Sequence, residues 1–209
     1  NEDCDGFTDE GVRPFGSSLA SVLGNAAKLA RGNTGFIGIL RSNSLSRIYR
    51  VDAAGATTVT PANQDLADVV SVDIARIDSG QWVTAAGFGA GGVNVRLIGL
   101  SGTDPVSLDS ESVPDTGAGG IARVAANSAT DAMTIYRSGS TIRVANVDFM
   151  AATATSMALP GTNPRAELGM DIAPRGVGNG YVVTWVTGTS PTVNIATVSA
   201  GLVVAVNGV

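Results

Sequence analysis

The 209-residue sequence contains no histidine, one cysteine (Cys4) and one lysine (Lys28). Without histidine, the chain lacks the most common general base, the Ser-His-Asp triad and histidine-ligated metal sites. The sequence also has no Gly-x-Ser-x-Gly, Gly-x-Gly-x-x-Gly or Walker motif, and Cys4 has no base beside it to activate a thiol. We therefore predict that the protein is not an enzyme.

Positive charge, long apolar runs and aromatic residues are also scarce. The net charge is −5 and no basic patch is visible, which excludes a nucleic-acid binder. No apolar run approaches the roughly 20 residues of a membrane-spanning helix. Aromatic residues make up 5% of the chain, and we expect Trp82, Tyr136, Tyr181 and Trp185 to pack in the core because they fall inside apolar segments. The sequence therefore offers no defined sugar site for a lectin-like function.

The residues that are abundant favour strands. Hydrophobic residues make up 44% of the chain, charged residues only 15%, and glycine occurs 27 times. This balance predicts a folded chain that can bury a core. Abundant valine and threonine favour strands, and abundant glycine favours tight turns.

A short step recurs four times along the chain. It reads Leu29-Ala30-Arg31, Ile74-Ala75-Arg76, Ile121-Ala122-Arg123 and Ile172-Ala173-Pro174, so the alanines are 45, 47 and 51 residues apart. Each copy opens four short apolar segments separated by turn residues. This period predicts an all-β, β-propeller-like fold of four repeats, each with four short antiparallel strands. Tandem β-sandwich domains are the alternative.

The predicted organisation follows from this repeat. Residues 1–12 form an acidic segment, residues 13–27 a linker, and the four repeats cover about 28–64, 65–114, 115–162 and 163–209. We expect the recurring alanine because only a small side chain fits where the innermost strands converge. If the four repeats do not close a ring by themselves, uncovered strands predict self-association.

Two carboxylates occupy equivalent places in the repeat. Asp73 and Asp171 both precede the Ile-Ala step, whereas the other two units have Lys28 and Gly120 there. Facing a central channel, these aspartates could hold a cation or a polar ligand, or serve a hydrolase or lyase; solvated residues at a strand end are the alternative. The remaining acidic group is predicted to form a solvated rim, and its members are Asp104, Asp109, Glu111 and Asp115.

The acidic segment has the spacing of a calcium loop. Oxygen-bearing side chains alternate along it, Gly6 permits a sharp turn, and Val12 stands where an EF-hand loop has its closing glutamate. A hard cation such as Ca²⁺ takes six to eight oxygen ligands, and the sequence has no cluster of soft ligands for Cu(I). The candidate metal ligands are Asn1, Asp3, Asp5, the Phe7 carbonyl, Asp9 and Glu10. A solvated acidic terminus is the alternative.

The run Asp3-Cys4-Asp5-Gly6-Phe7-Thr8-Asp9-Glu10 resembles the end of the metal-binding motif named after the methanotroph copper protein MopE. That motif occurs in secreted and surface proteins of myxobacteria and their relatives, and its upstream half, with a partner cysteine, is not in this sequence. The resemblance implies an extracellular or cell-surface protein, calcium rather than copper, and a disulfide from Cys4 to a cysteine upstream or in another chain. Because the chain begins inside the motif, we also expect it to be a piece of a longer protein.

Together these observations predict a secreted, calcium-binding structural or interaction module. Its expected partners are a second copy of the chain or another surface protein. A carbohydrate- or protein-binding propeller, with a polysaccharide as ligand, is the second hypothesis. An enzyme that uses Asp73 and Asp171 is the third.

Overall fold

A computed structural model of the chain describes residues 26–32, 35–42, 45–77, 80–113, 117, 120–161, 165, 169–175, 180–199 and 204–208. Within these ranges the chain is built from strands, and its helical content is the 3₁₀ turn Ala62–Gln64. The described residues include no helix that is long and apolar enough to cross a membrane. The all-β prediction is therefore confirmed.

Each predicted repeat forms one antiparallel sheet of four strands that pair in chain order. The first sheet consists of β1 (Ala26–Gly32), β2 (Gly35–Ser42), β3 (Leu45–Asp52) and β4 (Thr57–Val59). The second consists of β5 (Val69–Arg76), β6 (Trp82–Phe88), β7 (Val93–Ser101) and β8 (Asp104–Val113).

The third sheet consists of β9 (Ala122–Ser128), β10 (Asp131–Ser138), β11 (Thr141–Asp148) and β12 (Thr153–Ala158). The fourth consists of β13 (Met170–Pro174), β14 (Tyr181–Thr187), β15 (Thr192–Val198) and β16 (Val204–Gly208). Each repeat therefore holds the four antiparallel strands that the sequence predicts for it.

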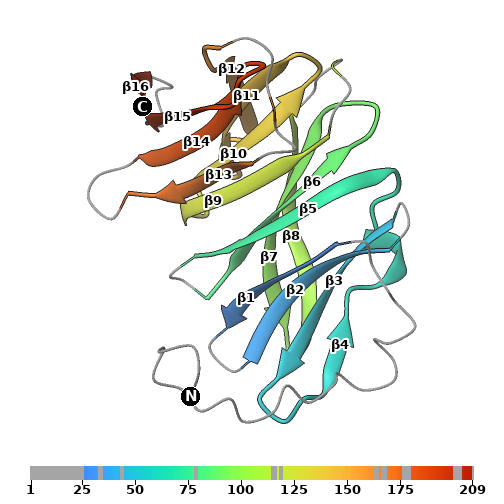
Figure 1. Cartoon of the computed structure of the whole chain (residues 1–209). Coiled ribbons are helices and arrows are strands. Elements are labelled where there is room, and N and C mark those ends of the chain that lie inside the picture. The colour runs from blue at the N-terminus through green and yellow to red at the C-terminus, as the bar shows by residue number, and fades with distance from the viewer. Residues whose placement is uncertain are drawn as a thin grey trace, which may run out of the picture.

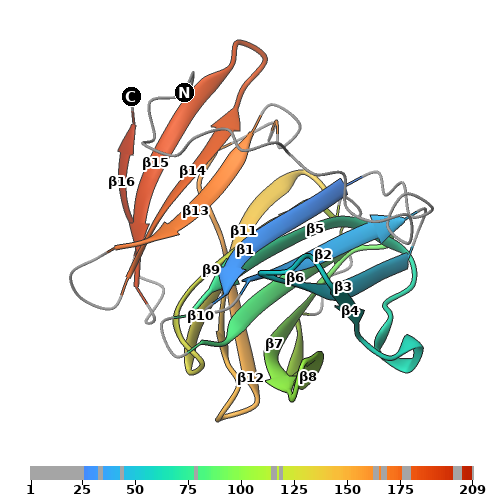
Figure 2. The same cartoon turned by 90° about the horizontal axis from the view of Figure 1, so that it is seen from below.

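The four sheets follow one another in space in the order of the chain (Figure 1, Figure 2). The first strands make the contacts: β1 lies beside β5, β5 beside β9, and β9 beside β13. Among the described residues, no contact of comparable extent joins the fourth sheet back to the first. The sheets therefore form an open series and do not close into a barrel.

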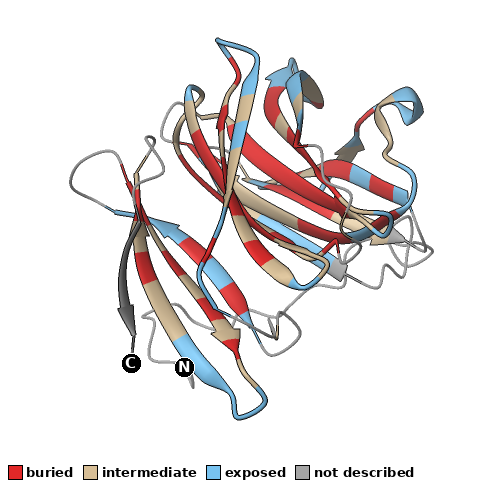
Figure 3. Cartoon of the chain, turned by 90° about the horizontal axis from the view of Figure 1, so that it is seen from above, coloured by how far each residue is buried: buried red, intermediate tan, exposed pale blue. Residues whose placement is uncertain are grey.

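Side chains alternate between the two faces of a strand, and a sheet with a neighbouring sheet on each side packs on one neighbour with each face. We call the face toward the next sheet the front face and the opposite one the back face. In the fourth sheet the front face is the one directed away from the third sheet. Three apolar cores lie in the three spaces between consecutive sheets, and Figure 3 shows the buried residues along these strands.

The first core joins the front of the first sheet (Ile37, Ile39) to the back of the second (Trp82, Ile98). The second core joins the front of the second sheet (Val83, Val95) to the back of the third, which includes Tyr136. The third joins the front of the third sheet (Ile135, Val144) to the back of the fourth, where Tyr181, Val183 and Trp185 lie. Trp82, Tyr136, Tyr181 and Trp185 are 2% exposed or less, which confirms their predicted place in the core.

Polar groups also join neighbouring sheets. The Trp82 indole N–H donates to the Arg31 carbonyl over 3.2 Å, and the Trp185 indole N–H donates to the Pro160 carbonyl over 3.2 Å. The Tyr181 hydroxyl donates to the Asp131 carbonyl over 2.6 Å. Each bond runs from a buried aromatic side chain to backbone of the preceding sheet or its exit, so the aromatic residues fix the spacing of the sheets as well as filling it.

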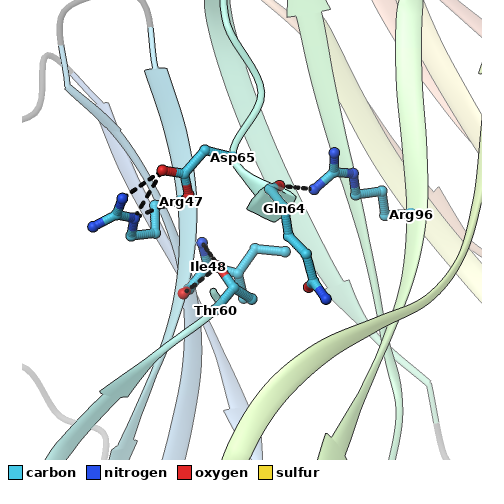
Figure 4. Close-up of polar contacts among 6 residues, drawn as sticks. All are labelled: Arg47, Ile48, Thr60, Gln64, Asp65 and Arg96. Carbon is cyan, nitrogen blue, oxygen red and sulfur yellow. Dashed lines mark hydrogen bonds and ion pairs between the residues drawn. The ribbon is translucent and has the colours of Figure 1, made fainter. Parts of the chain in front are cut away.

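The connection between the first two sheets is held by side chains from both (Figure 4). Arg47 on β3 forms an ion pair with Asp65, and this bond raises the pKa of the Arg47 guanidinium. Arg96 on β7 donates to the Gln64 carbonyl, while burial lowers the pKa of its guanidinium. Gln64 and Asp65 in this connection therefore link β3 to β7.

Candidate functional site

One charged residue from each first strand lies at the same place in its sheet. The backbone pairings set the positions: Lys28 opposes Ile39, Asp73 opposes Ala85, Arg123 opposes Ile135, and Asp171 opposes Thr184. All four begin a row on the front face of their sheet. We call these four residues the charged quartet.

The charged quartet lines one pocket of about 430 Å³. The rest of its wall comes from the fourth sheet and the approach to it: Gly169, Met170, Thr184, Trp185, Val186 and Val193. The first strands therefore bring two cations and two carboxylates around one open volume, although these residues are 45 or more positions apart in the sequence.

Asp73 is the most constrained member of the quartet. Its carboxylate Oδ2 accepts the Val124 N–H over 3.0 Å. Burial raises the pKa of Asp73, while the Val124 N–H and the charges of Arg123 and Lys28 oppose that rise. The side chain thus carries a structural hydrogen bond to β9 as well as facing the pocket, which the solvated alternative did not anticipate.

The other members keep more hydrogen-bonding capacity. The Arg123 Nη1 donates to the carbonyl of Ala122 over 2.8 Å, which holds the guanidinium against its own strand. Asp171 Oδ1 accepts the N–H of Ile172 over 2.9 Å, and the residue is exposed. Lys28 is exposed on β1. The pocket therefore combines a cation held against its own strand, an exposed cation and an exposed carboxylate.

The sequence repeat named Asp73 and Asp171 as possible channel residues and put Lys28 at the equivalent position, but it missed Arg123. The repeat alignment placed Gly120 and Ala122 in the third unit as the equivalents of Asp73 and Ala75. The pairing of β9 with β10 is displaced by three residues from that alignment. The step that matches Asp73-Ile74-Ala75 is Arg123-Val124-Ala125. That alignment was available in the sequence, since a β-branched residue followed by alanine also occurs there.

The steric reason given for the recurring alanine is wrong for the fourth unit. Ala122 is fully buried, but Ala173 is exposed. Glycine permits a close approach between the second and third sheets. A Cβ added at Gly87 on β6 would overlap the carbonyl oxygen of Gly120, which precedes β9.

Two faces have no described sheet packed on them. The back of the first sheet carries Leu29, Phe36, Leu45 and Val59, which are 45–49% exposed. The front of the fourth sheet carries Val193, which is 50% exposed, together with half-buried Val182 and Ile195. In the middle sheets the corresponding faces are the buried walls of the cores.

The remaining predicted groups are as follows. The candidate calcium ligands Asn1, Asp3, Asp5, Phe7, Asp9 and Glu10 lie outside the described residues. Of the predicted acidic rim, Asp104 and Asp109 are exposed, Glu111 is half-buried on β8, and Asp115 lies outside the described residues. The described part of the chain holds no group of three or more His, Cys, Asp or Glu side chains placed to share a metal ion.

In comparisons with known proteins, no family model matches the chain, and no curated protein sequence matches it.

Proposed function

We propose that this chain is an interaction module of the β-propeller type that associates with a second copy of itself through the two sheet faces on which no described sheet packs. The observation that carries the proposal is the back face of the first sheet. Four large apolar side chains there are about half exposed, whereas the back faces of the next three sheets are buried. Contiguous apolar residues on a soluble protein mark interaction surfaces.

The propeller-type arrangement is supported by how the middle sheets are covered. In a β-sandwich each sheet packs through one face and leaves the other to solvent. The second sheet uses Trp82 on its back face and Val83 on its front face, and both side chains are buried. A sheet covered on both faces by its sequence neighbours is typical of stacked propeller blades.

A second copy is the partner that fits both unpacked faces. Inside the chain, every junction places a front face on the back face of the next sheet. Among the described residues, no sheet packs on the front face of the fourth sheet or on the back face of the first. Two copies can therefore join in the same sense at two identical contacts, which gives a closed two-fold ring of eight sheets.

Solution mass tests the self-association. We expect light scattering at increasing protein concentration to give the mass of two chains. The substitution Phe36→Glu should shift the protein to the mass of one chain, because it places a charge in the apolar contact. Leu108→Glu is the matched control, since Leu108 is 51% exposed on β8, away from both faces. A wild-type monomer at every concentration would contradict the proposal.

Calcium binding and an extracellular location complete the proposed function, and both are supported by the acidic segment and its resemblance. Titration with Ca²⁺ by calorimetry is expected to show one site, which Asp5→Asn weakens by removing a charged ligand. The control is Asp104→Asn, which removes the same charge from an exposed position on β8. Equal binding by wild type and Asp5→Asn would sink the calcium assignment.

A further inference from the structure

The charged quartet has a composition that suits a particular kind of ligand. Asp73 gives one carboxylate oxygen to the Val124 N–H, and burial in the fold favours its neutral form. Lys28 and Arg123 each interact electrostatically with Asp73, but no ion pair within 4.0 Å ties either cation to it in the described residues. The pocket therefore holds two cations, one carboxylate whose negative charge is disfavoured by burial and one exposed carboxylate. This balance leaves room for an incoming anion.

The geometry around the cations favours a carboxylate over a bulky polyanion. The Arg123 guanidinium is planar and is already held at one nitrogen by the carbonyl of Ala122, so its remaining N–H groups can meet two oxygens side by side. Lys28 adds a flexible point charge. Asp171 would repel a second negative group, whereas it would accept hydrogen bonds from hydroxyls.

The size and lining of the pocket extend this description. A volume of about 430 Å³ lies in the range of small-molecule sites. Val186 and Val193 supply an apolar wall, and Thr184 supplies a hydroxyl between them and Asp171. A single sugar ring with a carboxylate presents these features together: an acidic group, several hydroxyls and C–H groups.

We propose that the pocket lined by Lys28, Asp73, Arg123 and Asp171 binds a hexuronate, as the free sugar or as a residue of an acidic polysaccharide. Lys28 and Arg123 hold the carboxylate of the sugar, and Asp171 accepts hydrogen bonds from its ring hydroxyls. Val186 and Val193 contact its C–H face. Asp73 positions the site by fixing β5 to β9 beneath it. The pocket shares Val193 with the fourth-sheet face proposed for self-association, whereas Phe36 lies on the opposite face of the first sheet from Lys28, so breaking the two-copy contact at Phe36 leaves the pocket residues in place.

The test is an NMR or calorimetric titration of the whole chain with D-glucuronate, D-glucose and acetate. We expect glucuronate to bind at least about tenfold more tightly than either glucose or acetate, since each of these lacks half of the recognised groups. Binding of acetate as tight as that of glucuronate would overturn the sugar assignment. No binding of glucuronate at millimolar concentration would overturn the site.

Matched variants separate the pocket from general charge. Lys28→Gln and Arg123→Gln are each expected to weaken glucuronate binding about tenfold or more. Arg31→Gln is the control: it removes the same charge from the same strand, three residues from Lys28 and therefore on the other face. An equal loss with Arg31→Gln would contradict the proposal. Repeating the titration with Phe36→Glu, in which the two-copy contact is broken, lets the two proposals fail separately.

Discussion

The junction between the second and third sheets and the back face of the first sheet are built from the same kind of strand, yet they hold different residues. At the junction, Gly87 and Gly120 let two backbones approach, and the Ser71 hydroxyl donates to the Gly120 carbonyl and accepts the Ala122 N–H. On the back face of the first sheet, large apolar side chains such as Leu29 and Phe36 remain half exposed.

The difference shows what closes a sheet-to-sheet contact in this protein. Apolar side chains are present on both surfaces, so they do not by themselves explain the difference. The closed junction adds small residues where backbones meet and polar side chains that satisfy backbone groups which no strand ladder reaches. The following substitutions test that distinction, in order of expected effect.

The largest effect is expected from Gly87→Ala. The new methyl group would overlap the carbonyl oxygen of Gly120, which belongs to the backbone and cannot rotate away. Overpacking of this kind should lower the free energy of unfolding by about 3 kcal/mol, measured by urea denaturation. Gly89→Ala is the control, because its Cβ would lie 3.3 Å from a methyl group of Val70, a side chain that is 39% exposed, and this substitution should cost much less. Equal costs would mean that the close approach does not limit stability.

Removing the hydroxyl of Ser71 should have the next largest effect. Ser71→Ala leaves the Gly120 carbonyl and the Ala122 N–H without that partner in a buried place. The expected loss is about 2 kcal/mol of unfolding free energy. Hydrogen exchange of the Ala122 amide should speed up in parallel. Ser107→Ala on β8 is the control, because that hydroxyl bonds to an exposed carbonyl.

Asp73→Asn should change how stability depends on pH. Burial raises the pKa of Asp73 in the folded chain above its unfolded value of about 3.9. The folded state therefore holds the proton more tightly, so this carboxyl contributes stability that is complete below the unfolded pKa and is lost as pH rises through the folded one. Asparagine can keep a hydrogen bond from the Val124 N–H but does not titrate.

Urea denaturation across the acidic range, compared between wild type and Asp73→Asn, measures this contribution. We expect the variant to gain stability relative to wild type as pH rises toward neutrality. A difference between the two proteins that stays constant with pH would contradict the raised pKa. Asp104→Asn, at an exposed position, should leave the profile unchanged.

The smallest effect on stability is expected from Phe36→Ser. Phe36 is 48% exposed, so its replacement should change the unfolding free energy of the single chain by about 1 kcal/mol or less. The measurement must be made at a concentration where the chain is monomeric, because a bound second copy would add its own stabilisation. A loss as large as that of Gly87→Ala would show that Phe36 is part of a core.

Much of the fold followed from periodicity, because four strands per repeat depend on local alternation and turn residues such as those after Phe88. The place of Asp73 and Asp171 on first strands followed from the same repeat. Arg123 did not, since the third unit pairs three residues away from its best sequence match. The hydrogen bonds of Ser71 and the approach of Gly87 to Gly120 depend on how separate sheets meet, which no local pattern encodes.

Among the described residues, each sheet makes its extensive contacts with the sheets that come before and after it in the chain. The fold is therefore a linear array in which every unit supplies one half of a contact and borrows the other half from its neighbour. In such an array, the contacts between neighbouring units do not fix the total number of units. A gene duplication that inserts another unit between two existing ones would present the same pair of faces as before, so the number of sheets could change without redesign of any single sheet.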